Sequence, residues 1–185
     1  MRLRYCARRA RSAVLLAVVL AAVPAATQSV SAPGLKAAYL LNFARFVEWP
    51  AEIVPAEAPL VLCIVNDGAV ASALEQAING RSVQNRSLSV VRLVAGASLP
   101  MCHVVYLAAS EPKHALDVIA ALDGRLVLTV SDTPRFAQTG GMVELFVEQG
   151  RLRIVVNVDA LQRAKVRLSS RVLALATIVR DAVSQ

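Results

Sequence analysis

The hydrophobic pattern of this chain alternates between short continuous apolar runs and segments with helical spacing. Residues 60–65, LVLCIV, form one such run, which is typical of a strand buried on both faces. The segments 87–94, 103–109 and 125–131 predict three more strands. Because helical segments separate the first strand from the second and the third from the fourth, the pattern predicts an α/β fold, with a mainly parallel sheet flanked by helices on both faces.

Helix signals lie between and before the predicted strands. The first helix is expected to begin at Leu35 and to stop at Trp49-Pro50, since the residue before proline avoids the helical region. Asp67 is placed to cap a second helix, which Asn79-Gly80 ends, and a third is expected over 110–122. The residues expected on the buried stripe of the first helix are Leu35, Ala38, Tyr39, Asn42, Phe43, Phe46 and Val47.

The last third of the chain has a different pattern. Residues 142–148 and 151–158 flank Gln149-Gly150 and predict an antiparallel hairpin at one edge of the sheet. A short helix is expected over 159–165, and a final helix over 170–183. The centre of that final helix is apolar almost all round, which favours a place in a core or an interface.

The N-terminus carries a separate pattern. Residues 1–12 hold five arginines and no acid, and an apolar run follows at 13–23. That run is shorter than the roughly 20 residues that a membrane-spanning helix needs. The pattern predicts a signal peptide over 1–25, a flexible lead-in over 26–34 and a single domain over 35–185, in an exported, periplasmic protein. A retained membrane anchor is the alternative.

Charge at first suggests a nucleic-acid-binding protein, because the formal net charge is +7, from 20 basic and 13 acidic residues. Without the five N-terminal arginines the balance is 15 against 13, or +2, and the case for nucleic acid is lost. One basic stretch remains near the C-terminus, and it is the candidate contact with an acidic partner or with lipid headgroups. It consists of Arg163, Lys165, Arg167, Leu168 and Arg171. A solvated helix face is the alternative.

The aromatic residues are unevenly distributed. Phe43, Phe46 and Trp49 are three of the eight aromatic residues and fall within seven positions. Core packing explains such a stripe, and a dimer or partner surface is the alternative explanation.

Candidate chemistry is sparse. Two cysteines follow the predicted signal, Cys63 and Cys102, and an even count in an exported domain favours a disulfide worth about 4 kcal/mol. Two buried thiols are the alternative. His103 adjoins Cys102, which could suggest a thiol-imidazole pair. Neighbouring residues in a strand face opposite ways and rarely form such a pair, so an ordinary surface role is expected for His103. No metal, cofactor or catalytic residue is predicted. A small-ligand-binding module would use the crevice near Asn66-Asp67-Gly68.

An ordered set of segments resembles the YfiR-like family of periplasmic proteins. The segments are GLKAAYLLNFARFVEWP (34–50), LCIVND (62–67), NGRSV (79–83), Cys102-His103, LTVSD (128–132), GGM (140–142) and the closing 151–176. The resemblance implies a non-enzymatic α/β domain, usually dimeric, that binds the periplasmic part of an inner-membrane diguanylate cyclase. Binding would repress cyclic di-GMP production and so restrain biofilm formation. An outer-membrane lipoprotein would relieve that repression by sequestering the repressor.

The resemblance also bears on the cysteines. Cys63 and Cys102 match the core disulfide of the family. The better-known members have a second cysteine pair after the LTVSD strand, where this chain has Ala137 and Glu144 near the expected places. A redox switch that depends on the second pair is therefore not expected here.

Overall fold

The computed structural model describes residues 32–50, 54–55, 57–109, 112–149 and 151–181. The predicted signal peptide, 1–25, lies outside these ranges. In chain order the elements are α1 (Ala32–Phe46), β1 (Val47–Glu48), β2 (Leu60–Val65), α2 (Gly68–Ile78), β3 (Ser82–Val83), β4 (Arg86–Leu93), β5 (Val104–Leu107), α3 (Pro112–Ala121), β6 (Leu128–Ser131), β7 (Val143–Glu148), β8 (Arg151–Asn157), α4 (Val158–Arg163), β9 (Arg167–Leu168), α5 (Ser170–Leu173) and β10 (Thr177–Val179). Within those ranges, no helix is both long enough and apolar enough to span a membrane.

The main sheet has eight strands in the order β10-β8-β7-β6-β5-β2-β4-β3. Its neighbouring strands are parallel except for β7 with β8 and β3 with β4. The predicted α/β fold with a mainly parallel sheet is therefore confirmed. The β7–β8 hairpin lies one strand in from the edge, because β10 pairs outside β8. Separately, β1 and β9 form a two-stranded antiparallel sheet.

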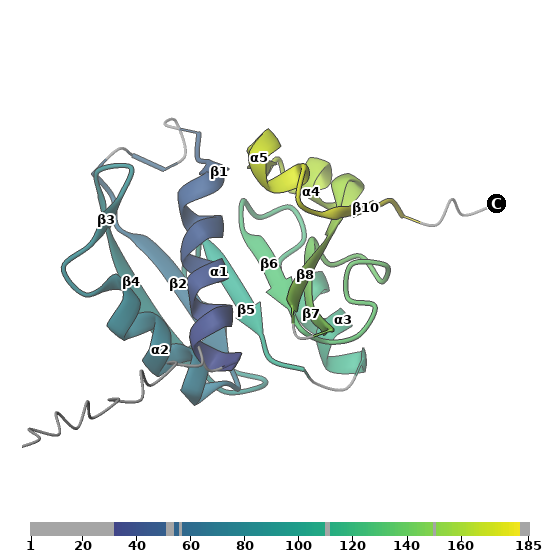
Figure 1. Cartoon of the computed structure of the whole chain (residues 1–185), viewed down its shortest axis with the longest axis horizontal. Coiled ribbons are helices and arrows are strands. Elements are labelled where there is room, and N and C mark those ends of the chain that lie inside the picture. The colour runs from purple at the N-terminus through teal and green to yellow at the C-terminus, as the bar shows by residue number, and fades with distance from the viewer. Residues whose placement is uncertain (1–31, 51–53, 56, 110–111, 150, 182–185) are drawn as a thin grey trace, which may run out of the picture.

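Helices cover both faces of the main sheet. Leu62 and Ile64 of β2 belong to a core shared with α1, α2 and α4, whereas the alternate residues Cys63 and Val65 pack with α3. In Figure 1, α1 lies in front of β5. The side-chain alternation of a strand buried on both faces explains this division.

Helix α1 differs from the expectation in its start and its buried face. It begins at Ala32, because Pro33 fits the first turn of a helix, where no N–H is needed. Its buried residues are Ala37, Leu40, Leu41, Phe43 and Ala44. The predicted stripe is confirmed at Phe43 and Val47, and Tyr39 and Phe46 pack partly buried against the same core. It was wrong at Ala38 and Asn42, which are exposed.

The predicted final helix over 170–183 is wrong. Helix α5 is a single turn, and the chain then extends into β10 (Thr177–Val179), which pairs in parallel with β8. All three residues of β10 are β-branched, which lowers helix propensity and favours strands. The free edge of β8 supplies the partner.

Candidate functional site

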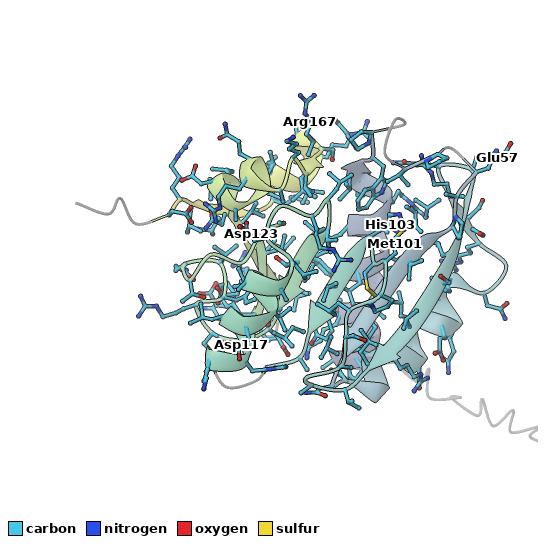
Figure 2. The ribbon with its side chains drawn as sticks, turned by 180° about the vertical axis from the view of Figure 1, so that it is seen from behind. Glu57, Met101, His103, Asp117, Asp123 and Arg167 are labelled. Carbon is cyan, nitrogen blue, oxygen red and sulfur yellow. A yellow bond between two sulfur atoms is a disulfide. The ribbon has the colours of Figure 1, made fainter. Side chains whose placement is uncertain are left out.

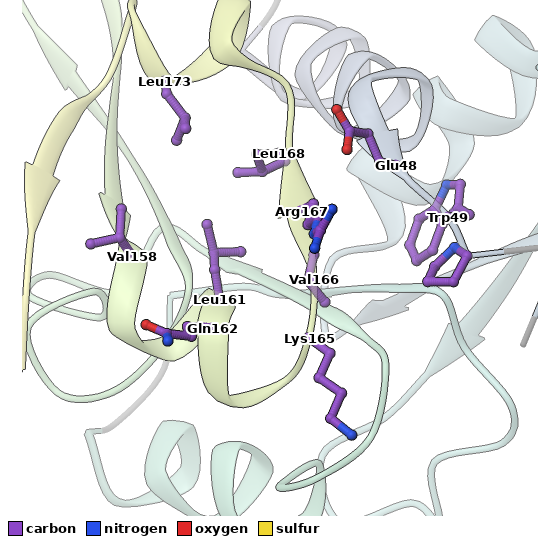
Figure 3. Close-up of a pocket in the computed structure, with 11 residues that line it drawn as sticks. Glu48, Trp49, Val158, Leu161, Gln162, Lys165, Val166, Arg167, Leu168 and Leu173 are labelled. Carbon is purple, nitrogen blue, oxygen red and sulfur yellow. The ribbon is translucent and has the colours of Figure 1, made fainter.

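A groove of about 880 Å³ opens between the end of α1 and the segment from α4 to α5. Its lining residues are Glu48, Trp49, Pro50, Val158, Leu161, Gln162, Lys165, Val166, Arg167, Leu168 and Leu173. Figure 3 shows Leu161, Leu168 and Leu173 gathered on one side and Glu48 and Trp49 on the other. We call this feature the C-terminal groove.

The small β1–β9 sheet joins the two walls of the groove. Val47 lies opposite Leu168 and Glu48 opposite Arg167, and the N–H of Ser169 donates to the carbonyl of Phe46 at 3.0 Å. Backbone hydrogen bonds therefore fix the end of α1 against a segment about 120 residues later in the chain.

Trp49 is held firmly in the first wall. Only 8% of the residue is exposed, and its indole N–H donates to the carbonyl of Ala44 at 3.2 Å. The ring meets the His103 ring edge to face, with 5.5 Å between centroids. A buried indole with its N–H satisfied gives the groove a rigid apolar corner.

Asn157 positions α4 in the second wall. It is fully buried, and its Oδ1 accepts from the N–H groups of Asp159 and Ala160, both at 3.0 Å, which caps the helix. Its amide donates to the carbonyl of Ala137 and to Asp181 Oδ1, both at 2.8 Å. One side chain therefore joins α4, the segment before β7 and the C-terminal strand.

Asp181 continues this network. It also pairs with Arg163, and the hydrogen bond from Asn157 together with the Arg163 guanidinium lowers the pKa of the Asp181 carboxyl. The Asp181 N–H in turn donates to Asp159 at 3.1 Å. The end of β10 is anchored to α4 by polar contacts.

The groove has an apolar floor and unpaired positive charge nearby. Lys165, Arg167 and Arg171 are exposed, and no ion pair involves them within the part of the chain that the structure describes. Glu48 is the one carboxylate among the lining residues. Such a surface can accept an apolar segment flanked by acidic groups.

The predicted partner residues are brought only partly together. Lys165, Arg167 and Leu168 line the groove, Arg171 is exposed on α5, and Arg163 is engaged by Asp181. The sequence did not single out Leu161, Gln162 or Leu173, because an apolar face on so short a helix has no periodicity to detect.

The three predicted aromatic residues have separate places. Phe43 is a core residue at 1% exposure, and Phe46 packs partly buried against the same core. Trp49 belongs to the same core and also lines the groove, so core packing accounts for all three residues and a partner surface stays a prediction for Trp49.

The disulfide between Cys63 and Cys102 is present in the structure, with 5.9 Å between the Cα atoms. A surface role was predicted for His103, the residue after Cys102, and this prediction was wrong. His103 is 8% exposed, and its Nδ1 accepts the N–H of Val61 at 3.0 Å. Burial, with the nearby charge of Arg86, lowers the pKa of the His103 imidazole. Figure 2 shows His103 next to Met101, away from Asp117 and Asp123.

Glu144 has a role that the sequence did not reveal. It is buried at 7% exposure, and its carboxylate accepts the N–H of Arg135 at 3.0 Å and the N–H of Ala137 at 3.3 Å. Positions 137 and 144 are therefore in contact, where the resemblance placed a second cysteine pair. In this chain the Glu144 carboxylate ties the loop to β7.

The crevice at Asn66-Asp67-Gly68 holds a cavity of about 230 Å³. Asp67 caps α2 there as predicted, because its carboxylate accepts the Val70 N–H at 2.9 Å. Among the described residues, no three His, Cys, Asp or Glu side chains are grouped as a metal site.

The structure is thus an α/β sheet with a groove between the end of α1 and the segment from α4 to α5. Residues 33–177 match the model of a protein family described as YfiR/HmsC-like, and the chain therefore belongs to this family. No curated protein matches the chain.

Proposed function

We propose that this protein is a non-enzymatic periplasmic regulator that binds the periplasmic part of an inner-membrane diguanylate cyclase and represses cyclic di-GMP production. Its family membership supports this class of function. The observation that carries the proposal is the C-terminal groove, in which an apolar floor lies beside cations without an ion-pair partner among the described residues. Partner surfaces commonly have this composition.

Repression requires only that the regulator prefer one state of its partner. Binding that favours the inactive state of the cyclase by a few kcal/mol shifts most of its population. An outer-membrane lipoprotein that competes for the regulator would reverse the shift. The signal peptide proposed for residues 1–25, with cleavage after Ala25, would deliver the protein to the periplasm.

A charge reversal tests the groove. We expect Lys165→Glu with Arg167→Glu to weaken capture of the cyclase from membranes by about 10-fold or more, and to raise cyclic di-GMP and surface attachment as gene deletion does. The matched control is Lys113→Glu, an exposed reversal on α3. If the double variant folds and cyclic di-GMP stays at the wild-type level, the groove is not the contact.

A small-ligand-binding module is the second candidate function. The cavity of about 230 Å³ at the carboxyl end of β2 favours it, because ligands of open α/β sheets bind at such ends. Its size is below the roughly 300–1,000 Å³ of most ligand sites. A thermal-shift screen with metabolites separates the two functions: saturable stabilisation that Asp67→Ala abolishes would favour this one.

A further inference from the structure

The C-terminal end of α1 is capped by residues from other parts of the chain. The last carbonyls of a helix have no partner within it, and α1 has no glycine after Phe46 to form a local cap. The indole N–H of Trp49 donates to the carbonyl of Ala44 at 3.2 Å, and the N–H of Ser169 donates to the carbonyl of Phe46 at 3.0 Å. The capping of α1 and the first wall of the C-terminal groove are therefore built from the same contacts.

Gln84, in the turn between β3 and β4, supplies two further hydrogen bonds to this region. Its side-chain amide donates to the carbonyl of Arg45 at 3.0 Å and to the carbonyl of Val47 at 3.1 Å. Its Oε1 accepts a hydrogen bond from Nη1 of Arg86 at 3.1 Å. One side chain therefore holds the last turn of α1 and the strand β1, which come directly before Trp49.

Arg86 holds the chain on the other side of Trp49. The residue is 5% exposed, and its guanidinium donates to the carbonyl of Val54 at 2.8 Å and to the carbonyl of Pro55 at 3.2 Å. Over the residues that the structure describes, Arg86 forms no ion pair, so its cation is held by neutral oxygens. Burying a cation without a carboxylate is costly, which points to a positional role for this side chain.

The turn that carries these contacts has an unfavourable backbone for its sequence. Gln84 and Asn85 have φ angles of 50° and 64°, both in the left-handed region. A two-residue hairpin turn with two positive φ angles is of type I′, for which Asn-Gly is strongly preferred. Gln84 lacks that preference, but its longer side chain reaches the carbonyls of α1 and β1. Non-glycine residues in this region are often found at functional sites.

We propose that Gln84 and Arg86 are positioning residues for the C-terminal groove. They hold the chain before and after Trp49, so that the first wall is in place before a partner binds. Neither residue lines the groove itself. A binding surface that is ordered in advance loses less conformational freedom on binding. The effect on binding rests on the function proposed above, whereas the order of Trp49 can be measured on the protein alone.

Fluorescence quenching tests the order of the wall, because Trp49 is the single tryptophan of the chain. We expect Gln84→Ala and Gln84→Glu to raise the acrylamide quenching constant of the full chain by about 2-fold or more, since both remove the N–H donors and allow local opening. Gln84→Glu keeps an acceptor for Arg86, so it isolates the loss of the donors. Arg86→Lys keeps the charge without the planar fork and should change quenching in the same direction. The matched control is Gln76→Ala, an exposed position on α2, which should be quenched like the wild type.

A redesigned turn separates positioning from stability. Gln84→Asn/Asn85→Gly introduces the sequence that type I′ turns favour, with a side chain one methylene too short for the two carbonyls. We expect this variant to be more stable than Gln84→Ala in urea unfolding and yet to show the same raised quenching of Trp49. Asn85→Gly alone keeps Gln84 and should be quenched like the wild type. A hairpin that only stabilised the fold would give the redesigned variant wild-type quenching.

Capture of the cyclase from membranes tests the effect on binding. We expect Gln84→Ala to weaken capture by about 10-fold, although every lining residue remains. Wild-type quenching in folded Gln84→Ala, Gln84→Glu or the redesigned turn would overturn the proposal, and wild-type quenching in folded Arg86→Lys would overturn the role of Arg86. Raised quenching with undiminished capture, when Lys165→Glu with Arg167→Glu does weaken capture, would overturn the effect on binding. If neither set of variants alters capture, the cyclase contact fails, and quenching still decides whether Gln84 positions Trp49.

Discussion

Two loops of this domain are tied to the sheet by different chemistry. The loop 94–103, between β4 and β5, is held by the disulfide from Cys102 to Cys63 of β2. The loop 132–142, between β6 and β7, is held by the Glu144 carboxylate through the N–H groups of Arg135 and Ala137. A reductant can release the first loop but has no bond to break in the second. The difference teaches that one domain can hold one loop by a bond that a reductant breaks and another by hydrogen bonds that it leaves intact.

Removing the covalent tie should have the largest effect. In the double variant Cys63→Ala/Cys102→Ala, we expect the free energy of unfolding to fall by about 2–4 kcal/mol, because a 39-residue separation is no longer closed in the unfolded chain. Urea unfolding measures this. Reductant should lower the stability of the wild type by a similar amount and leave the double variant unchanged. A wild type that is insensitive to reductant would show that the disulfide contributes little.

Removing the carboxylate tie should have a smaller effect. Glu144→Gln places an NH₂ group against backbone N–H donors, and we expect it to cost about 1–3 kcal/mol of unfolding free energy, with or without reductant. The control is Glu148→Gln on the same strand, where the carboxylate is exposed and pairs with Arg153. Equal effects of the two substitutions would contradict the distinction between the loops.

The smallest effect should come from the protonation of His103, the residue next to the disulfide-bonded Cys102. The pKa of His103 is lowered below its ordinary value of 6.5 in the folded state, so the unfolded chain binds the proton more readily. The contribution of neutral His103 to the free energy of unfolding is therefore fully present above pH 6.5 and should be lost progressively as the pH falls below it. Urea midpoints at pH 7.5 and 5.0 measure the slope, which His103→Gln should reduce. Asp181, whose pKa is lowered from 3.8, contributes only at more acidic pH. An unchanged slope in the variant would exclude His103 as its source.

Local signals predicted much of the fold. The run at 60–65, the Asp67 cap and the hairpin around position 149 were predicted correctly because each depends on neighbouring residues. The strand at Thr177–Val179 was not, because its conformation depends on the free edge of β8, which no local window contains. His103 and Glu144 were missed for a similar reason. Their hydrogen-bond partners, Val61 for one and the 135–137 backbone for the other, come together only in the tertiary structure.

The pairing of β1 with β9 has a consequence for the order of folding. Val47 and Leu168 are about 120 residues apart, so the two walls of the groove meet only after the intervening sheet has formed. A chain in which only one of these two segments has folded has one wall of the groove without the other. The groove is therefore complete only when the two ends of the domain have folded against each other.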